Sequence, residues 1–103
     1  MSDVIYPLGL RIAGRKVVVV GGGAVGTRRV KGLLQAGANV TVISPMVSAE
    51  IKELALTGQL ELVERGFESG DLSDAWLVHT ATGSTEVDQQ VTDEAEALRI
   101  LCV

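Results

Sequence analysis

Four consecutive valines, Val17–Val20, run directly into a glycine-rich segment, and this junction constrains the fold more than any other part of the chain. A short run of β-branched apolar residues is typical of a strand that is buried on both faces. Gly21, Gly23 and Gly26 then follow with the spacing G-x-G-x-x-G. We therefore expect a buried strand, a tight turn and a helix in direct succession.

Each glycine of this spacing has a physical role. The first makes the tight turn, the second lets the backbone approach a pyrophosphate, and the third lets the helix pack closely on the strand. The phosphates would lie at the helix N-terminus, where backbone N–H groups are free. We interpret the segment as a dinucleotide site. A turn that binds nothing and a site for a related nucleotide, such as S-adenosylmethionine, are the alternatives.

Composition narrows the class of protein. The 103 residues suffice for one domain, and a hydrophobic fraction of 47% with only 3% aromatic residues predicts an aliphatic core. A net charge of -4 argues against nucleic acid or an anionic membrane as a partner. A single cysteine, Cys102, favours a reducing cytoplasmic location. No apolar run approaches the roughly 20 residues of a membrane helix, and the N-terminus lacks the pattern of a signal peptide.

Strand and helix patterns alternate along the chain. The expected strands are Lys16–Val20, Asn39–Ile43, Leu60–Glu64, Ala75–Ala81 and Ile100–Val103. The expected helices are Ala24–Gln35, Val47–Leu56 and Thr85–Leu98. This alternation predicts an α/β fold: a doubly wound, Rossmann-like parallel sheet of order 3-2-1-4-5 in three α/β/α layers, spanning residues 1–103. We expect Ser44-Pro45 to end the second strand.

Ligands of such sheets bind beyond the carboxyl ends of the strands, where the strand order reverses. The segments expected there are Gly21–Gly26, Ser44–Met46 and Ala81–Ser84. The second segment lacks the acid that usually binds the ribose, although Ser44 can hydrogen-bond a ribose hydroxyl. No arginine follows directly to hold a 2′-phosphate, which favours NAD over NADP. Close approach of the backbone at Thr82 and Gly83 makes that turn a candidate for cofactor contact.

Several other side chains have competing interpretations. His79, the only histidine, is expected to be packed and hydrogen-bonded rather than catalytic, and Cys102 to be a small core residue. We place Val25 on the apolar face of the first helix and Asp71 in a solvated loop. Asp88 faces either the pocket or solvent. For Arg28 and Arg29 a solvated helix face is favoured over a role in binding the cofactor.

These segments together resemble the N-terminal module of siroheme synthase and the stand-alone precorrin-2 dehydrogenases. The resemblance covers nearly the whole chain and is most specific at the strand ends. It rests on Tyr6–Leu8, Gly14–Gly26, Arg28–Arg29, Leu33–Pro45, Gly58–Leu62 and Trp76–Thr82. Members of this family use NAD to oxidise precorrin-2 to sirohydrochlorin, and some also insert iron, which is a lyase activity.

The resemblance also implies roles for individual residues. Gly21, Gly22, Gly23, Ala24 and Val25 would hold the pyrophosphate. Pro45 and Met46 would contact the adenosine end, and Thr82 the nicotinamide side. The family's catalytic aspartate follows its fifth strand, so we expect it just beyond Val103 and expect this chain to be truncated before it. No catalytic residue or metal ligand is therefore assigned within the chain.

Two positions depart from the family pattern. Gly83-Ser84 stands where an acidic or polar pair is usual, and Asp88 stands where asparagine is usual. The resemblance implies a tetrapyrrole substrate and a homodimer at full length. The alternative, from a different class, is a non-catalytic NAD(H)-sensing domain of a transporter or repressor.

Overall fold

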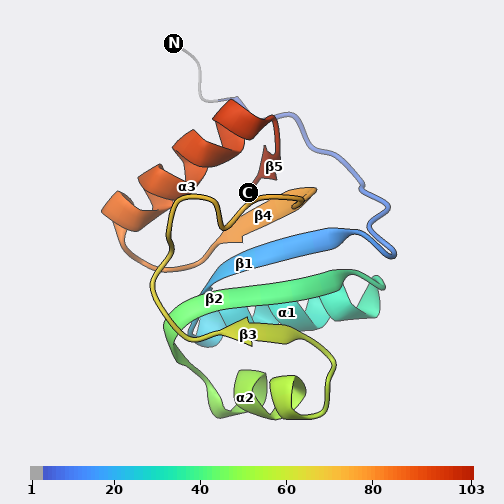
Figure 1. The fold of residues 1–103 in the computed structure, drawn as a ribbon. Coiled ribbons are helices and arrows are strands. Elements are labelled where there is room, and N and C mark those ends of the chain that lie inside the picture. Colours follow the sequence, from blue (N-terminus) through green and yellow to red (C-terminus); the bar gives the residue numbers. More distant parts are fainter. Residues whose placement is uncertain (1–3) are drawn as a thin grey trace.

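Five parallel strands form one sheet in the order β3-β2-β1-β4-β5 in the computed structural model, which describes residues 4–103 (Figure 1). The strands are β1 (Lys16–Gly22), β2 (Asn39–Val47), β3 (Glu61–Val63), β4 (Leu77–Thr80) and β5 (Leu101–Cys102). The helices are α1 (Ala24–Gln35), α2 (Ala49–Leu56) and α3 (Thr85–Leu98). The predicted α/β class and strand order are confirmed.

The valines of β1 divide the core into two parts. Val17 and Val19 point to one face, where they pack with Val30 of α1 and Ile51 of α2. Val18 and Val20 point to the other face, where they join a cluster that includes Val91 of α3. Side chains alternate along a strand, so four consecutive apolar residues serve both faces at once. The sheet therefore lies between two helical layers, as the sequence predicts.

Strand β2 is longer than predicted. The expected break at Ser44-Pro45 is wrong, because β2 continues to Val47 and pairs there with Gly22 of β1. The register shifts between Val20 and Gly22, so residues 44–46 form an irregular segment opposite Gly21. Proline lacks an N–H, and such an irregularity accommodates it because no ladder bond is required there. The irregular segment brings Ser44–Met46 beside the glycine turn.

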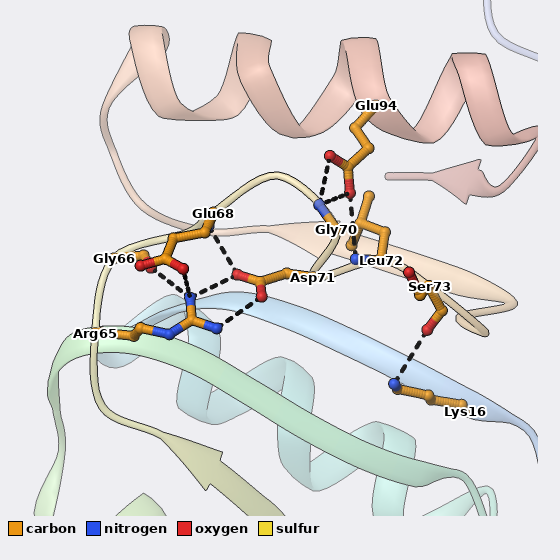
Figure 2. A network of polar contacts seen from close by, with 9 residues as sticks. All are labelled: Lys16, Arg65, Gly66, Glu68, Gly70, Asp71, Leu72, Ser73 and Glu94. Carbon is orange, nitrogen blue, oxygen red and sulfur yellow. Dashed lines mark hydrogen bonds and ion pairs between the residues drawn. The ribbon is translucent and has the colours of Figure 1, made fainter.

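The connection from β3 to β4 contains no helix and is held by a polar network (Figure 2). Arg65 pairs with Asp71 through both guanidinium nitrogens, and Glu94 of α3 accepts hydrogen bonds from the backbone N–H groups of Gly70 and Leu72. The Leu72 side chain is fully buried in the core beneath α3. The expectation that Asp71 is merely solvated is therefore wrong.

Two apolar residues lie in places that the sequence did not indicate. Cys102 is exposed, because β5 lies at the edge of the sheet and pairs only with β4. Val25 is 46% exposed, while Thr27, Val30 and Leu33 of α1 are buried. The predicted core placement is wrong for both Cys102 and Val25.

Between residues 4 and 103, no helix has both the length and the apolar character needed to cross a membrane.

Candidate functional site

A cavity of about 380 Å³ lies at the carboxyl ends of β1, β2 and β4. Four segments line it: Val20–Gly23, Ile43–Met46, Gly66 with Phe67, and Ala81, Thr82, Ser84 and Val87. This is the edge of the sheet at which the strand order reverses, and doubly wound folds bind ligands there. None of the lining residues carries a charged side chain. The cavity therefore suits a largely apolar group with a few polar contacts.

The junction of β1 and α1 requires glycine at two of the three motif positions. Gly21 has φ +120°, a conformation that side chains rarely adopt, and a Cβ there would collide with the backbone carbonyl of Ala81. A Cβ at Gly26 would collide with the carbonyl oxygen of Gly21. Gly26 therefore permits the close helix–strand packing that the motif predicts.

Gly23 differs from these two glycines. A Cβ built on it would have no atom within 4 Å, and its backbone is extended rather than left-handed. The protein itself therefore does not need glycine at this position. Because Gly23 also lines the cavity, the open space beside it is available to a ligand that approaches the backbone.

Within residues 4–103, the N-terminus of α1 has neither a side-chain cap nor an acidic residue in its first turn. Its N-cap residue is Gly23. The other two helices are capped by Ser48 and Ser84, and each has at least one acidic residue in its first turn. The first N–H groups of a helix and its macrodipole attract anions. The end of α1 that adjoins the cavity is therefore open to a phosphate.

Ser48 fixes the glycine turn to the rest of the fold. Its backbone N–H donates to the carbonyl of Gly22 at 2.8 Å, and its side chain caps α2 by accepting from Ile51. Its hydroxyl also lies 2.7 Å from that of Thr27, which donates to the carbonyl of Gly23. These bonds tie the starts of α1 and α2 together and hold the turn in place.

The irregular segment of β2 presents a buried serine to the cavity. Ser44 Oγ donates to the backbone oxygen of Met46 at 2.7 Å, so its only proton has an internal partner. Ser44 can therefore accept a hydrogen bond from a ribose hydroxyl but has no free proton to donate. Met46 lies beside it with its side chain largely exposed.

Thr82 lies on the opposite side of the cavity, at the end of β4. Its Oγ1 is 2.6 Å from a carboxylate oxygen of Asp88, and it accepts from the backbone N–H of Ser84 at 3.0 Å. Asp88 is half-buried and stands in the first turn of α3. Of the two orientations left open by the sequence, the structure thus places Asp88 against a residue that lines the cavity.

The structure brings most of the predicted site residues together. Seven of them line the cavity, namely Gly21, Gly22, Gly23, Ser44, Pro45, Met46 and Thr82. Ala24, Val25 and Gly83 lie outside its lining. Ala24 and Val25 nevertheless belong to the uncapped first turn of α1.

Sequence reasoning missed the wall formed by Gly66, Phe67 and Val87. Phe67 packs against the core beneath α3 and reaches the cavity through a loop that has no regular structure. The loop that carries Phe67 is held by the Arg65–Asp71 pair and by Glu94, and Figure 2 shows these contacts. The only available signal for Phe67 was its aromatic type, since the chain has a single phenylalanine.

His79 is half-buried on β4 and contacts α1 rather than the cavity. Its Nδ1 lies 2.9 Å from Nη1 of Arg29, so a neutral imidazole accepts a hydrogen bond from the guanidinium. Burial lowers the pKa of His79 below its ordinary value, and the positive charge of Arg29 lowers it further. The predicted packed histidine is confirmed. The favoured solvated position is wrong for Arg29, whereas Arg28 is exposed.

Within residues 4–103, no cluster of three His, Cys, Asp or Glu side chains is placed to hold a metal ion.

Comparisons with known proteins match nearly the whole chain. The model of a family described as NAD(P)-binding matches residues 8–103. The chain is 42% identical to a precorrin-2 dehydrogenase of Priestia megaterium, over 84% of this chain and 43% of that protein. It is 38% identical to siroheme synthase 2 of Cronobacter sakazakii, over 93% of this chain and 21% of that protein.

The fold has a close counterpart among solved structures. The structure of SirC, a precorrin-2 dehydrogenase, superimposes with a TM-score of 0.82 at 39% identity, covering 95% of this chain and 48% of that one. The chain thus spans less than half the length of each of these three proteins.

Proposed function

The chain belongs to the NAD(P)-binding family whose model it matches over residues 8–103. From this membership and from the named relatives, we propose that it forms the NAD-binding portion of a precorrin-2 dehydrogenase. Residues 1–103 would act as one Rossmann-like cofactor domain. The complete protein would oxidise precorrin-2 to sirohydrochlorin on the route to siroheme. The relatives favour this function over a regulatory NAD(H)-sensing domain.

One observation carries the cofactor part of the proposal: the uncapped start of α1 lies beside the open space at Gly23. Among the residues described, Gly23 is a motif glycine that neither internal packing nor backbone conformation explains. A pyrophosphate fills such a space and accepts hydrogen bonds from the N–H groups of the first helical turn. The residues present therefore fit the dinucleotide that the family binds.

The lining supports NAD rather than NADP. A 2′-phosphate near the end of β2 would need a cationic partner, and no lysine or arginine lines the described cavity. Ser44 offers an acceptor to a ribose hydroxyl, and Pro45 and Met46 offer apolar contact to the adenosine. Gly21–Val25 would hold the pyrophosphate, and Thr82 with Gly83 would lie at the nicotinamide side.

The chain's contribution to the reaction is placement. NAD, when bound, accepts the hydride that the tetrapyrrole loses. The glycine turn fixes the phosphates, the apolar wall at Phe67 and Val87 excludes water, and the end of β4 orients the reactive ring. Each of these elements is tied to the sheet by hydrogen bonds or core packing, so the site is largely formed before the cofactor arrives.

Calorimetric titration tests the cofactor proposal. We expect NAD to bind and NADP to bind more weakly. Gly23→Ala should abolish NAD binding while the melting temperature stays near that of the parent, because the added methyl occupies the phosphate space and touches no protein atom. Gly32→Ala is the matched control, since it adds the same methyl in open space on α1, remote from the cavity. Folded protein that gives no heat with millimolar NAD would refute the proposal.

The enzymatic part is tested in the complete protein that carries this domain. Formation of sirohydrochlorin, followed by absorbance, should depend on NAD and should be lost with Gly23→Ala but not with Gly32→Ala.

We also propose a cytoplasmic homodimer for the complete protein. Cys102, a free thiol in this chain, suits a reducing compartment. Sedimentation analysis of the complete protein measures the state of assembly. A sedimentation coefficient of a monomer would contradict the dimer.

A further inference from the structure

We propose that Asp88 fixes the polarity of the Thr82 hydroxyl, so that the β4 side of the cavity accepts a hydrogen bond from a carboxamide and rejects a carboxylate in its place. The inference rests on the proposed function, because it concerns the nicotinamide end of the bound dinucleotide. It assigns a specificity-determining role to Asp88, whose side chain does not itself line the cavity.

The hydrogen bonds of Thr82 decide what its hydroxyl can offer. A threonine hydroxyl has one proton to donate and two lone pairs that accept. The proton has two acceptors within reach, and Asp88 Oδ1 at 2.6 Å is nearer than the backbone oxygen of Ser84 at 3.2 Å. Because a carboxylate can only accept, the Thr82 proton points to Asp88. One lone pair accepts from the backbone N–H of Ser84 at 3.0 Å. What remains for a ligand in the cavity is one acceptor position.

The topology indicates which part of the dinucleotide meets this acceptor. The pyrophosphate is centred on the glycine turn after β1, and the ribose of the adenosine is bound at the end of β2. The sheet order places β4 on the other side of β1. The second half of the dinucleotide, with its nicotinamide, therefore extends toward the end of β4. Thr82 and Ser84 both line the cavity with hydroxyl-bearing side chains at that strand end. Thr82 is the one that bonds Asp88, while the Ser84 hydroxyl caps α3 by accepting from the N–H of Val87.

Charge reinforces the polarity. In the described part of the chain, no lysine or arginine forms an ion pair with Asp88. The cavity lining is likewise without cationic side chains. The negative charge one hydrogen bond behind Thr82 is thus balanced only by the start of α3, in whose first turn Asp88 lies. A carboxamide N–H can donate a hydrogen bond to Thr82 Oγ1. A carboxylate has no proton to donate, so its oxygen lone pairs would face those of Thr82 Oγ1 and its charge would be repelled by that of Asp88.

The substitution Asp88→Asn reverses this logic. An asparagine side chain carries both a donor and an acceptor, so its NH₂ can donate to Thr82. The hydroxyl proton can then turn to an acceptor on the ligand or to the backbone oxygen of Ser84 at 3.2 Å. The hydroxyl then becomes a donor as readily as an acceptor. The preference for a carboxamide over a carboxylate on the nicotinamide ring should therefore fall in Asp88→Asn, which replaces one carboxylate oxygen by an NH₂ group.

The experiment compares NAD with nicotinic acid adenine dinucleotide, which has a carboxylate in place of the carboxamide, by calorimetric titration. We expect the parent protein to bind NAD about tenfold more tightly or better, and Asp88→Asn to bring the two affinities within about threefold. Thr82→Ser keeps the hydroxyl and should keep the preference. Thr82→Val removes it and should lose the preference.

Glu86→Gln is the matched control. Glu86 lies in the same first turn of α3, is exposed, and carries the same charge without a hydrogen bond to Thr82. Its substitution should leave the ratio of affinities unchanged. Equal affinity of the parent for both dinucleotides, or a Glu86→Gln effect as large as that of Asp88→Asn, overturns the inference and leaves the proposed function standing. Failure of the folded parent to bind either dinucleotide overturns both.

Discussion

Arg65 and Asp71 face each other as a two-point ion pair, with Nη1 of Arg65 2.8 Å from Oδ2 of Asp71 and Nη2 2.7 Å from Oδ1 (Figure 2). Such a pair fixes direction as well as distance, because the planar guanidinium matches the carboxylate. In the sequence, Phe67 lies between Arg65 and Asp71 and forms part of the cavity wall. Leu72, which directly follows Asp71, is buried in the core. The ion pair therefore links the cavity wall to the core.

Asp71→Asn should lower both the melting temperature and the affinity for NAD, because the connection from β3 to β4 loses the ion pair with Arg65 that holds it in place. In the folded protein, the hydrogen bonds from Arg65 lower the pKa of Asp71 below its ordinary value. Its contribution to stability is therefore complete above the unfolded pKa of about 3.9 and is lost as the pH falls through the lower folded pKa. Melting curves from neutral to acid pH measure this loss, which should be smaller in the variant.

Glu68→Gln is the control for that prediction. Glu68 is exposed and lies 3.7 Å from the same guanidinium, so its charge contributes little. Equal effects of Glu68→Gln and Asp71→Asn would mean that net charge, rather than the two-point geometry, holds the loop.

Gly21→Ala should destabilise the fold by about 2 kcal/mol or more, since a left-handed backbone and a collision with the Ala81 carbonyl both oppose the methyl. Urea unfolding measures the change. Gly32→Ala, in an open position inside α1, should instead stabilise by up to about 1 kcal/mol. A neutral Gly21→Ala would show that the turn can adopt another conformation.

Ser48→Ala should cost about 1 kcal/mol, because it removes the cap of α2 together with the hydrogen bond to Thr27. Chemical unfolding again provides the measurement. Ser73→Ala is a suitable comparison: Ser73 is exposed, and its backbone oxygen, not its hydroxyl, accepts from Lys16. A cost as large for Ser73 as for Ser48 would argue against the capping explanation.

His79 should make stability depend on pH in the mildly acidic range. Its folded pKa is lowered, first by burial and then by Arg29, from an unfolded value of about 6.5. The unfolded chain therefore binds the proton more readily, so stability is full above about pH 6.5 and falls as the pH drops through the folded pKa. His79→Gln keeps an acceptor for Arg29 and should remove this slope from the unfolding free energy.

Nuclear magnetic resonance provides a second measurement, because the chain has one histidine. In Arg29→Gln the pKa of His79 should rise, yet stay below its ordinary value, since burial is the larger cause. A normal pKa in the parent protein would contradict the packed position.

The sequence was sufficient for the fold because its strongest signals are local. The Val17–Val20 run and the glycine spacing predicted β1 and the start of α1, and the alternation of patterns predicted the strand order. The prediction failed where a partner distant in sequence decides. Ser44-Pro45 did not end β2 because pairing with Gly22 carries the strand to Val47. No local pattern predicts such an extension.

The cavity likewise has one part that the sequence predicted and another that depends on partners distant in sequence. Its floor comes from strand ends that share an edge, which topology alone predicts. Phe67 was missed because its loop has no periodicity and is positioned by Arg65, Asp71 and Glu94, which come from two different parts of the chain. Cys102 was misplaced because apolar character at a sheet edge does not ensure burial.

The central place of β1 has a consequence for synthesis on the ribosome. Val17 pairs with Val40 on one side and with Leu77 on the other. The first partner is made soon after β1, but the second follows much later in the sequence, after β2, α2 and β3. Until then one edge of this valine-rich strand stands open, and an open edge can pair with another strand that reaches it. The edge of β1 is thus where unfinished chains are most exposed to aggregation.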